Sequence, residues 1–219
     1  MIRKDFILRM IEDMVAVIHR LAGLKIEQNY EAALALLDET YPRLTGLTGE
    51  LLRHAAPKTL LQLLSFAGEI EPARVVAAAE LLKEEGDLRA ELGRDDLAYA
   101  CYDRALFLFV ALIEQHGFMM LEGRLARIDA VADAIGLYTL PADVGLRLFS
   151  YYRLTHRYGD AEVWLFRALA ATEDRTALQD GISFFEDLLR REDRELTDGG
   201  ITRQEAEEGL AELRERWKR

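Results

Sequence analysis

The residues of this sequence that could do chemistry are few and widely spaced. Its four histidines, His19, His54, His116 and His156, stand singly along the chain. A zinc site needs three or four ligands that converge, and no His-Glu-x-x-His motif supplies two of them on one helix. We therefore expect no metal site, and we expect each histidine at a helix end or on the surface.

The single cysteine, Cys101, is the other candidate nucleophile. A reactive cysteine needs a neighbouring base or a helix N-terminus to form its thiolate, and no histidine lies within helical reach of Cys101 in the sequence. We expect it to be a small core residue with a slow thiol. One cysteine also excludes a disulfide framework within the chain.

Adjacent glutamates, such as Glu84 with Glu85 and Glu207 with Glu208, could in principle act as acid and base. Carboxylates are abundant on exposed helices, so the sequence favours a solvated face for both pairs. Neither a phosphate-binding glycine loop nor a nucleophile elbow is found. The sequence predicts no catalytic residue and no cofactor, and an enzyme with an unrecognised site is the less favoured alternative.

Composition narrows the choice of partners. The chain has 219 residues, with 39 Asp and Glu against 28 Lys and Arg, a formal net charge of −11. Nucleic acids and anionic membranes need a basic surface, so neither is expected as a partner. The longest apolar run, at 105–113, is too short for a bilayer, which needs about 20 residues, and charges interrupt the N-terminus where a secretory signal would be apolar. A cytoplasmic protein is expected.

Apolar residues recur at helical spacing through the whole chain, and no segment alternates with the period of a strand. These elements predict an all-α fold of about 10–11 helices in short-loop antiparallel pairs. The first helix carries a wide apolar stripe that could face the core or a second copy of the chain, and it is expected to stop between Gly23 and Asn29. Pro42 should end or kink the second helix.

Other punctuation marks the remaining elements. Pro57 and Pro72 are typical of first-turn prolines, and turns are expected at Gly93 and at Gly159. Residues 192–200 are expected to be a loop. Thr202 and Glu205 have the spacing of a capping box, so a last helix should follow them.

A helical repeat is visible in residues 79–106. Gly86, Gly93, Ala98, Tyr102 and Ala105 stand at the spacings of the tetratricopeptide repeat. Small residues there allow two helices to touch, Gly93 makes the turn, and Tyr102 is expected to fill the gap to the next pair.

A second pair of helices, at 148–169, offers matching residues at Tyr152, Tyr158, Ala161, Leu165 and Ala168. The repeat is degenerate, because Ala33, Ala98 and Ala161 are 65 and 63 residues apart and the usual period is about 34. The pattern still predicts antiparallel hairpins stacked as a tetratricopeptide-like right-handed array.

We expect one helical-repeat domain over 1–219, made of five consecutive parts. They are a first hairpin (1–45), a short-helix connector (46–71), the best-matching repeat hairpin (72–117), an extra helix with a second repeat hairpin (118–171), and a C-terminal hairpin (172–219).

The chain as a whole also resembles a family of uncharacterised bacterial proteins with a tetratricopeptide-like fold. The segments that carry the resemblance are MIRKDFILRMIE, AELLKEEGD and GISFFEDLLRREDRELTDGGITRQEAEEGLAEL. The resemblance covers most of the chain and implies the helical fold, and it implies no activity.

In tetratricopeptide arrays the first helix of each pair lines a groove for an extended peptide. By register, the groove positions on the two repeat hairpins here are Glu80, Lys83, Glu84, Asp87, Glu91, Leu146, Arg147, Ser150, Arg153 and Leu154. The candidate partner site consists of Lys83, Asp87, Arg147, Ser150 and Arg153, where the arginines could bind an acidic peptide or a C-terminal carboxylate. A solvated helix face, or internal ion pairs of the arginines, is the competing interpretation.

These features favour a protein-interaction module, an adaptor or scaffold that binds a protein or peptide segment and does no chemistry of its own. This function rests on analogy between folds. The alternative is a structural protein that self-associates as a homodimer through its first helix or its C-terminal hairpin.

Overall fold

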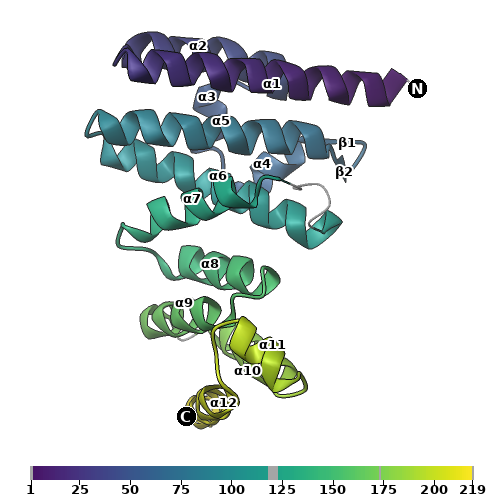
Figure 1. Ribbon diagram of the computed structural model, residues 1–219, viewed down its shortest axis with the longest axis vertical. Coiled ribbons are helices and arrows are strands. Elements are labelled where there is room, and N and C mark those ends of the chain that lie inside the picture. Colours follow the sequence, from purple (N-terminus) through teal and green to yellow (C-terminus); the bar gives the residue numbers. More distant parts are fainter. Residues whose placement is uncertain (1, 118–122, 173, 219) are drawn as a thin grey trace. The chain divides into compact units, whose positions relative to one another are not determined.

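The protein is all-α, as the sequence predicted. The computed structural model describes residues 2–117, 123–172 and 174–218, and within these it has twelve α-helices and one pair of two-residue strands (Figure 1). By contact the chain divides into two compact units, Met1–Tyr138 and Thr139–Arg219. The first unit contains α1 to α7 and the second contains α8 to α12. The single domain and the tetratricopeptide-like stacking stay predictions.

The first unit is built on α5 (Pro72–Glu91), which contacts α1 (Ile2–Ile26), α2 (Tyr30–Thr45) and α6 (Asp95–His116). In Figure 1, α1 and α2 lie side by side along one side of α5. The apolar run at 105–113 is mostly buried in α6. No helix in the described part of the chain is both long and apolar enough to cross a membrane.

The hairpin of α5 and α6 confirms the expected turn, since Gly93 joins the two helices with φ +66°. Ala98 is fully buried. The Tyr102 ring lies against Gly86, where an added Cβ would stand 2.6 Å from a ring carbon. Tyr102 therefore fills a space within its own hairpin, and its filling of the gap to a following pair stays a prediction.

Helix α1 stops between Gly23 and Asn29, as expected, whereas α2 does not end at Pro42. Helix α1 continues through Gly23 to Ile26, because a glycine inside a helix costs only about 1 kcal/mol and removes no backbone hydrogen bond. Helix α2 begins after Asn29, whose side chain accepts a hydrogen bond from the Ala32 N–H at 3.4 Å. It continues past Pro42 to Thr45 and ends at Gly46 with φ +74°.

The connector contains α3 (Gly49–His54) and α4 (Pro57–Leu63), and Pro57 is the first-turn proline that was expected. An unexpected antiparallel pair follows, β1 (Ser65–Phe66) with β2 (Glu69–Ile70). Two residues with positive φ, Ala67 and Gly68, make its turn, and such turns suit two-residue hairpins. The last helix of this unit is α7 (Leu125–Gly136). The first residues of the part expected to contain this extra helix, 118–122, lie outside the described residues.

In the second unit, α8 (Ala142–Leu154) and α9 (Tyr158–Ala171) form the other predicted hairpin. The turn is not at Gly159 as expected, because Gly159 already belongs to α9 and His156 takes the positive φ of 60°. Position 159 needs a glycine because Gly199 and Gly200 approach it closely. Its N–H donates to the Gly199 carbonyl at 3.0 Å, and a Cβ there would overlap the carbonyl of Gly200.

The rest of this unit is α10 (Arg175–Leu188), α11 (Asp193–Asp198) and α12 (Arg203–Trp217). Helix α11 lies within the segment that was expected to be a loop, so that prediction was wrong. The capping box is confirmed. The Thr202 hydroxyl accepts from the Glu205 N–H at 3.2 Å, and the Glu205 carboxylate accepts from the Thr202 N–H at 2.7 Å.

Candidate functional site

The densest group of ionisable side chains lies on α5, inside the first unit. Glu80, Glu84 and Glu85 are only 0%, 5% and 1% exposed. The expected solvated face for Glu84 and Glu85 is therefore wrong. Ionised carboxylates are costly to bury unless cations and hydrogen bonds compensate them, so their partners decide what this cluster can do.

Glu85 holds one end of the cluster. Its carboxylate accepts hydrogen bonds from the Tyr41 hydroxyl at 2.7 Å, from Arg53 at 2.9 Å and from Arg89 at 2.6 Å. Burial and the neighbouring Glu85 charge raise the pKa of Tyr41 well above its ordinary value, so its hydroxyl remains a donor. Glu85 thus joins α2 and α3 to α5.

Asp87 and Glu84 hold the middle of the cluster. Asp87 binds Lys83 at 2.7 Å and Lys25 at 3.1 Å, and it accepts from the Tyr102 hydroxyl at 3.0 Å. Burial alone would raise the pKa of Asp87, but the two lysines outweigh it and hold the pKa below its ordinary value. Glu84 accepts from Arg127 of α7 at 2.6 Å and lies 3.4 Å from Lys25.

Glu80 closes the cluster at its other end. One carboxylate oxygen accepts from Arg127. The second oxygen, Oε1, lies 4.0 Å from Arg124 and accepts no hydrogen bond from the described residues. Arg127 therefore bridges Glu80 and Glu84, and burial, which would lower its pKa, is outweighed by the two carboxylates, which raise it.

The pairing of these carboxylates determines their chemistry. A general base must be free to take a proton, whereas two or more cationic or hydroxyl donors already bind each of Glu84, Glu85 and Asp87. Such carboxylates fix the helices that carry the donors. The sequence did not indicate this, because most of the partners lie about 30 to 60 residues from α5 along the chain.

Two residues of the predicted groove, Lys83 and Asp87, belong to this cluster and bind each other. Both side chains are partly exposed. Since each is already paired within the fold, a partner would have to compete with those ion pairs. The groove at this hairpin stays a prediction.

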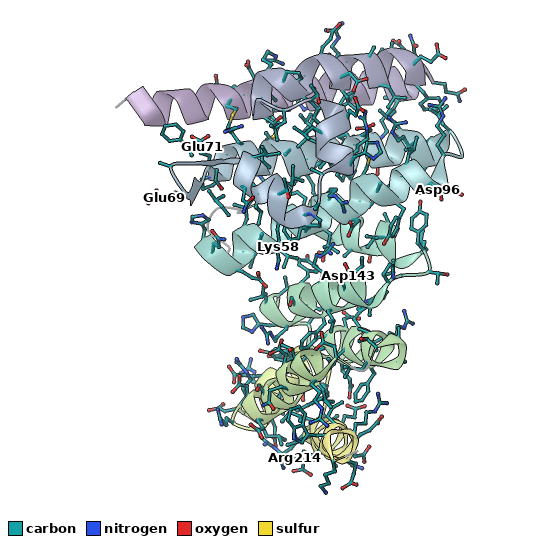
Figure 2. The ribbon with its side chains drawn as sticks, turned by 180° about the vertical axis from the view of Figure 1, so that it is seen from behind. Lys58, Glu69, Glu71, Asp96, Asp143 and Arg214 are labelled. Atoms are coloured by element: carbon teal, nitrogen blue, oxygen red, sulfur yellow. The ribbon has the colours of Figure 1, made fainter. Side chains whose placement is uncertain are left out.

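The other three groove residues, Arg147, Ser150 and Arg153, lie half-buried on α8 in the second unit. Arg147 binds Asp143 of the same helix at 3.3 Å, and Figure 2 shows Asp143 on that helix. Arg153 lies over the Phe149 ring, 5.5 Å from its centre. Both arginines of the predicted groove therefore already make contacts with side chains of their own helix.

Cys101 is fully buried, as predicted. Burial, and next the charge of Glu85, raise the pKa of its thiol far above the ordinary value, so the thiol is protonated at neutral pH and is a poor nucleophile. His156 lies with its Nδ1 2.7 Å from the Tyr158 hydroxyl. No group of three potential metal ligands occurs among the described residues.

Arginines stacked on aromatic rings are the chemistry that the sequence analysis missed. The described part of the second unit contains at least six such pairs, centred on Arg153, Arg157, Arg167, Arg175, Arg191 and Arg216. Proteins average roughly one strong pair in 70–80 residues. Helical spacing of Trp164 and Arg167 was a signal for one pair, while the Arg175–Trp217 pair depends on tertiary packing.

Comparison with known proteins places the chain in a family and indicates no activity. No curated protein and no solved structure matches the sequence. One family, described as a family of unknown function (DUF6483), matches residues 1–218. Because this match spans essentially the whole chain, the protein belongs to the DUF6483 family.

Proposed function

We propose that this protein is a non-enzymatic interaction module with a tetratricopeptide-like fold, an adaptor or scaffold in the bacterial cytoplasm that binds a protein or peptide segment. Two helical hairpins with close contacts support the fold. In one, Gly86 accommodates the Tyr102 ring, and in the other an added Cβ on Gly145 would stand 3.2 Å from the Cβ of Ala168. Such contacts are what stacked helical hairpins require.

The observation that carries the proposal is the pairing of the α5 carboxylates. Glu84, Glu85 and Asp87 hold helices together through lysine, arginine and tyrosine donors. Cys101, the one possible thiol nucleophile, is buried with a raised pKa. The side chains that could most readily act in catalysis thus stabilise the helix packing. Recognition of a partner by the protein surface is therefore the better-supported function.

The test is to capture partners on the full-length protein and to rebuild any complex from purified components. A stable complex with one defined partner, measured by calorimetry, is expected. A reaction catalysed by the purified protein and abolished by Glu85→Gln, but not by Glu91→Gln, would contradict the proposal. Glu91 is the matched control because it is an exposed glutamate of the same helix.

Self-association is a second candidate function, favoured by the length of α1. This helix has 25 residues and α2 has 16, so α1 is longer by about 13 Å at 1.5 Å per residue. Figure 1 shows its N-terminal end reaching beyond α2. Val15 on the same helix is an exposed apolar residue. Sedimentation of the pure protein separates the candidates, since a monomer at all concentrations excludes self-association.

A further inference from the structure

Helix α1 buries one apolar stripe in its own unit. Met10, Met14, Val17 and Leu21 are buried, and they recur at intervals of three and four residues, which is the spacing of one helix face. The helix packs on α2 and α5, and Figure 1 shows it on the side of the first unit that lies away from α6. This stripe is therefore the one that the unit itself covers.

A second apolar stripe lies on another face of the same helix. We call it the outer stripe, and it consists of Val15, Ile18, Ala22 and Ile26. Its first three members each follow a buried residue directly in the sequence, so the outer stripe is rotated by about 100° from the buried one, since a helix has 3.6 residues per turn. Leu8 and Ile11 continue the same spacing toward the N-terminus in the sequence.

The outer stripe is accessible to a partner. Val15 is 42% exposed and Ile26 is 84% exposed, while Ala22 is exposed and Ile18 is half-buried. Among the described residues, no atom lies within 4 Å of the Cβ position of the adjacent Gly23. The outer stripe is therefore an open apolar face, which another helix can approach closely.

The spacing of the outer stripe matches a second copy of itself. Apolar residues at intervals of three and four form a heptad seam, along which two helices pack side by side. When two copies of α1 run antiparallel about a twofold axis midway between Val15 and Ile18, Val15 faces Ile18 of the other copy. The same axis places Ala22 opposite residue 11 of the other copy. Every apolar position of the seam then meets another apolar position.

The residues that flank the outer stripe agree with this pairing. Glu12 and His19 are exposed on one side of it, and the antiparallel arrangement brings Glu12 beside His19 of the other copy, a carboxylate beside an imidazole. A membrane surface is a poorer occupant, because interfacial helices carry Lys and Arg on their polar face, whereas the exposed residues of α1 include Glu12 and Asp13.

We propose that the outer stripe joins two copies of this chain as an antiparallel pair of α1 helices. The inference rests on self-association, the second candidate function, and adds its surface, its orientation and its residue pairs. The stripe from Val15 to Ile26 extends about 17 Å at 1.5 Å per residue, so its interface is smaller than the roughly 800 Å² per partner of a stable complex. The dimer should therefore form reversibly, at micromolar concentrations.

Sedimentation velocity of the full-length protein over a range of concentrations measures this dimer. The wild type should pass from monomer to dimer as its concentration rises. Added salt should favour the dimer, because it screens the repulsion between two chains that each carry a net charge of −11. An interface held mainly by ion pairs would respond to salt in the opposite way.

A charge within the outer stripe should disrupt the dimer. Val15→Glu buries an unpaired carboxylate, and the twofold symmetry makes this change in both copies, so the dimer should weaken by at least about tenfold. Val163→Glu is the matched control. It adds the same charge at a valine of α9 that is 46% exposed, and it should leave the dimer unchanged.

A disulfide between two copies tests the orientation, and it does so even if Val15→Glu fails to fold. The variants Val15→Cys and Ile18→Cys are mixed in equal amounts and oxidised. We expect disulfides between the two different variants, whereas a parallel pair would link each variant to itself. Cys101 does not compete, because it is buried and the pKa of its thiol is raised.

The outcomes separate this proposal from the functions on which it depends. A wild type that stays monomeric up to about 200 μM overturns the dimer and the self-association function together, and it leaves the interaction module untouched. A dimer that Val15→Glu weakens no more than Val163→Glu does leaves self-association standing and overturns the outer stripe as its site. Disulfides within each cysteine variant alone overturn the antiparallel pairing. A complex with a different protein that Val15→Glu abolishes, while the wild type alone is monomeric, would identify another occupant and overturn the second copy.

Discussion

The unit Met1–Tyr138 places charged side chains inside its helix packing, whereas the unit Thr139–Arg219 lays arginines over aromatic rings. Glu80, Glu84 and Glu85 are buried in the first unit and depend on cations from other helices. In the second unit Arg167 and Arg175 keep contact with solvent. Charged side chains therefore have a different role in each unit. Buried ion pairs fix one arrangement of helices, and stacked arginines keep cationic donors available at a surface.

The energetic consequences should differ in the same way. Removing one partner of a buried ion pair strands the other charge and is strongly destabilising. Removing an exposed arginine from a ring loses only a cation–π contact, about 0.5–1 kcal/mol. Substitutions in the two units therefore test whether the contrast holds.

The largest effect is expected for Glu85→Ala. It leaves the half-buried Arg53 and Arg89 and the buried Tyr41 hydroxyl without their shared acceptor, which should lower the free energy of unfolding by about 3–5 kcal/mol. Denaturant melts followed by far-ultraviolet circular dichroism measure this. Glu91→Ala, at an exposed position of the same helix, should change it by less than about 0.5 kcal/mol. Equal effects of both substitutions would show that the cluster is not structural.

A smaller loss is expected when the α5–α6 hairpin is overpacked. Gly86→Ala puts a methyl group 2.6 Å from the Tyr102 ring, which should cost about 1–3 kcal/mol. Gly23→Ala is the matched control, since nothing lies within 4 Å of its Cβ position in α1, and it should stabilise the protein by about 0.5–1 kcal/mol. If both substitutions stabilise, the ring does not pack on Gly86 as described.

The sequence predictions succeeded where a feature depends on neighbouring residues, and they failed where it depends on residues far away in the sequence. Helical spacing and proline positions depend on local physics, and they predicted α5, α6, the Gly93 turn and the capping box. Gly159 failed because its small size answers to Gly199 and Gly200, some 40 residues later.

The candidate site was harder to predict than the fold. In the sequence, Glu84 and Glu85 are typical of an exposed helix face. They belong to a buried cluster because of tertiary contacts with Arg127, Lys25 and Arg53. Helical register did place Glu80, Glu84 and Asp87 on one face of α5. That face packs against cationic side chains of the same unit, which no local pattern specifies.

Stability should change little in the arginine variants of the second unit. Arg167→Gln and Arg175→Gln each lose a cation–π contact at an exposed site, so each should cost no more than about 1 kcal/mol. Thermal melts of the single variants provide the measurement. A loss as large as that of Glu85→Ala would mean that these arginines are structural, and the contrast between the units would disappear.

The smallest effect concerns Glu162 of α9, whose pKa is raised. Burial raises it first, and the charges of Glu205, Glu212 and Glu208 on α12 raise it further above the ordinary value of 4.5. The folded state then holds this proton more tightly than the unfolded state, so stability falls as the pH rises from 4.5 through the folded pKa. At neutral pH the full penalty is present, and below pH 4.5 it is absent.

Glu162→Gln should therefore stabilise the protein at pH 7 by less than about 1 kcal/mol, since the group is half exposed, and the gain should vanish in acid. Glu207→Gln removes the same charge from an exposed position of α12 and serves as the control in melts across this pH range. If Glu207→Gln stabilises the protein at pH 7 as much as Glu162→Gln does, the stabilisation comes from the change in net charge. Repulsion between Glu162 and the carboxylates of α12 would then not be its cause.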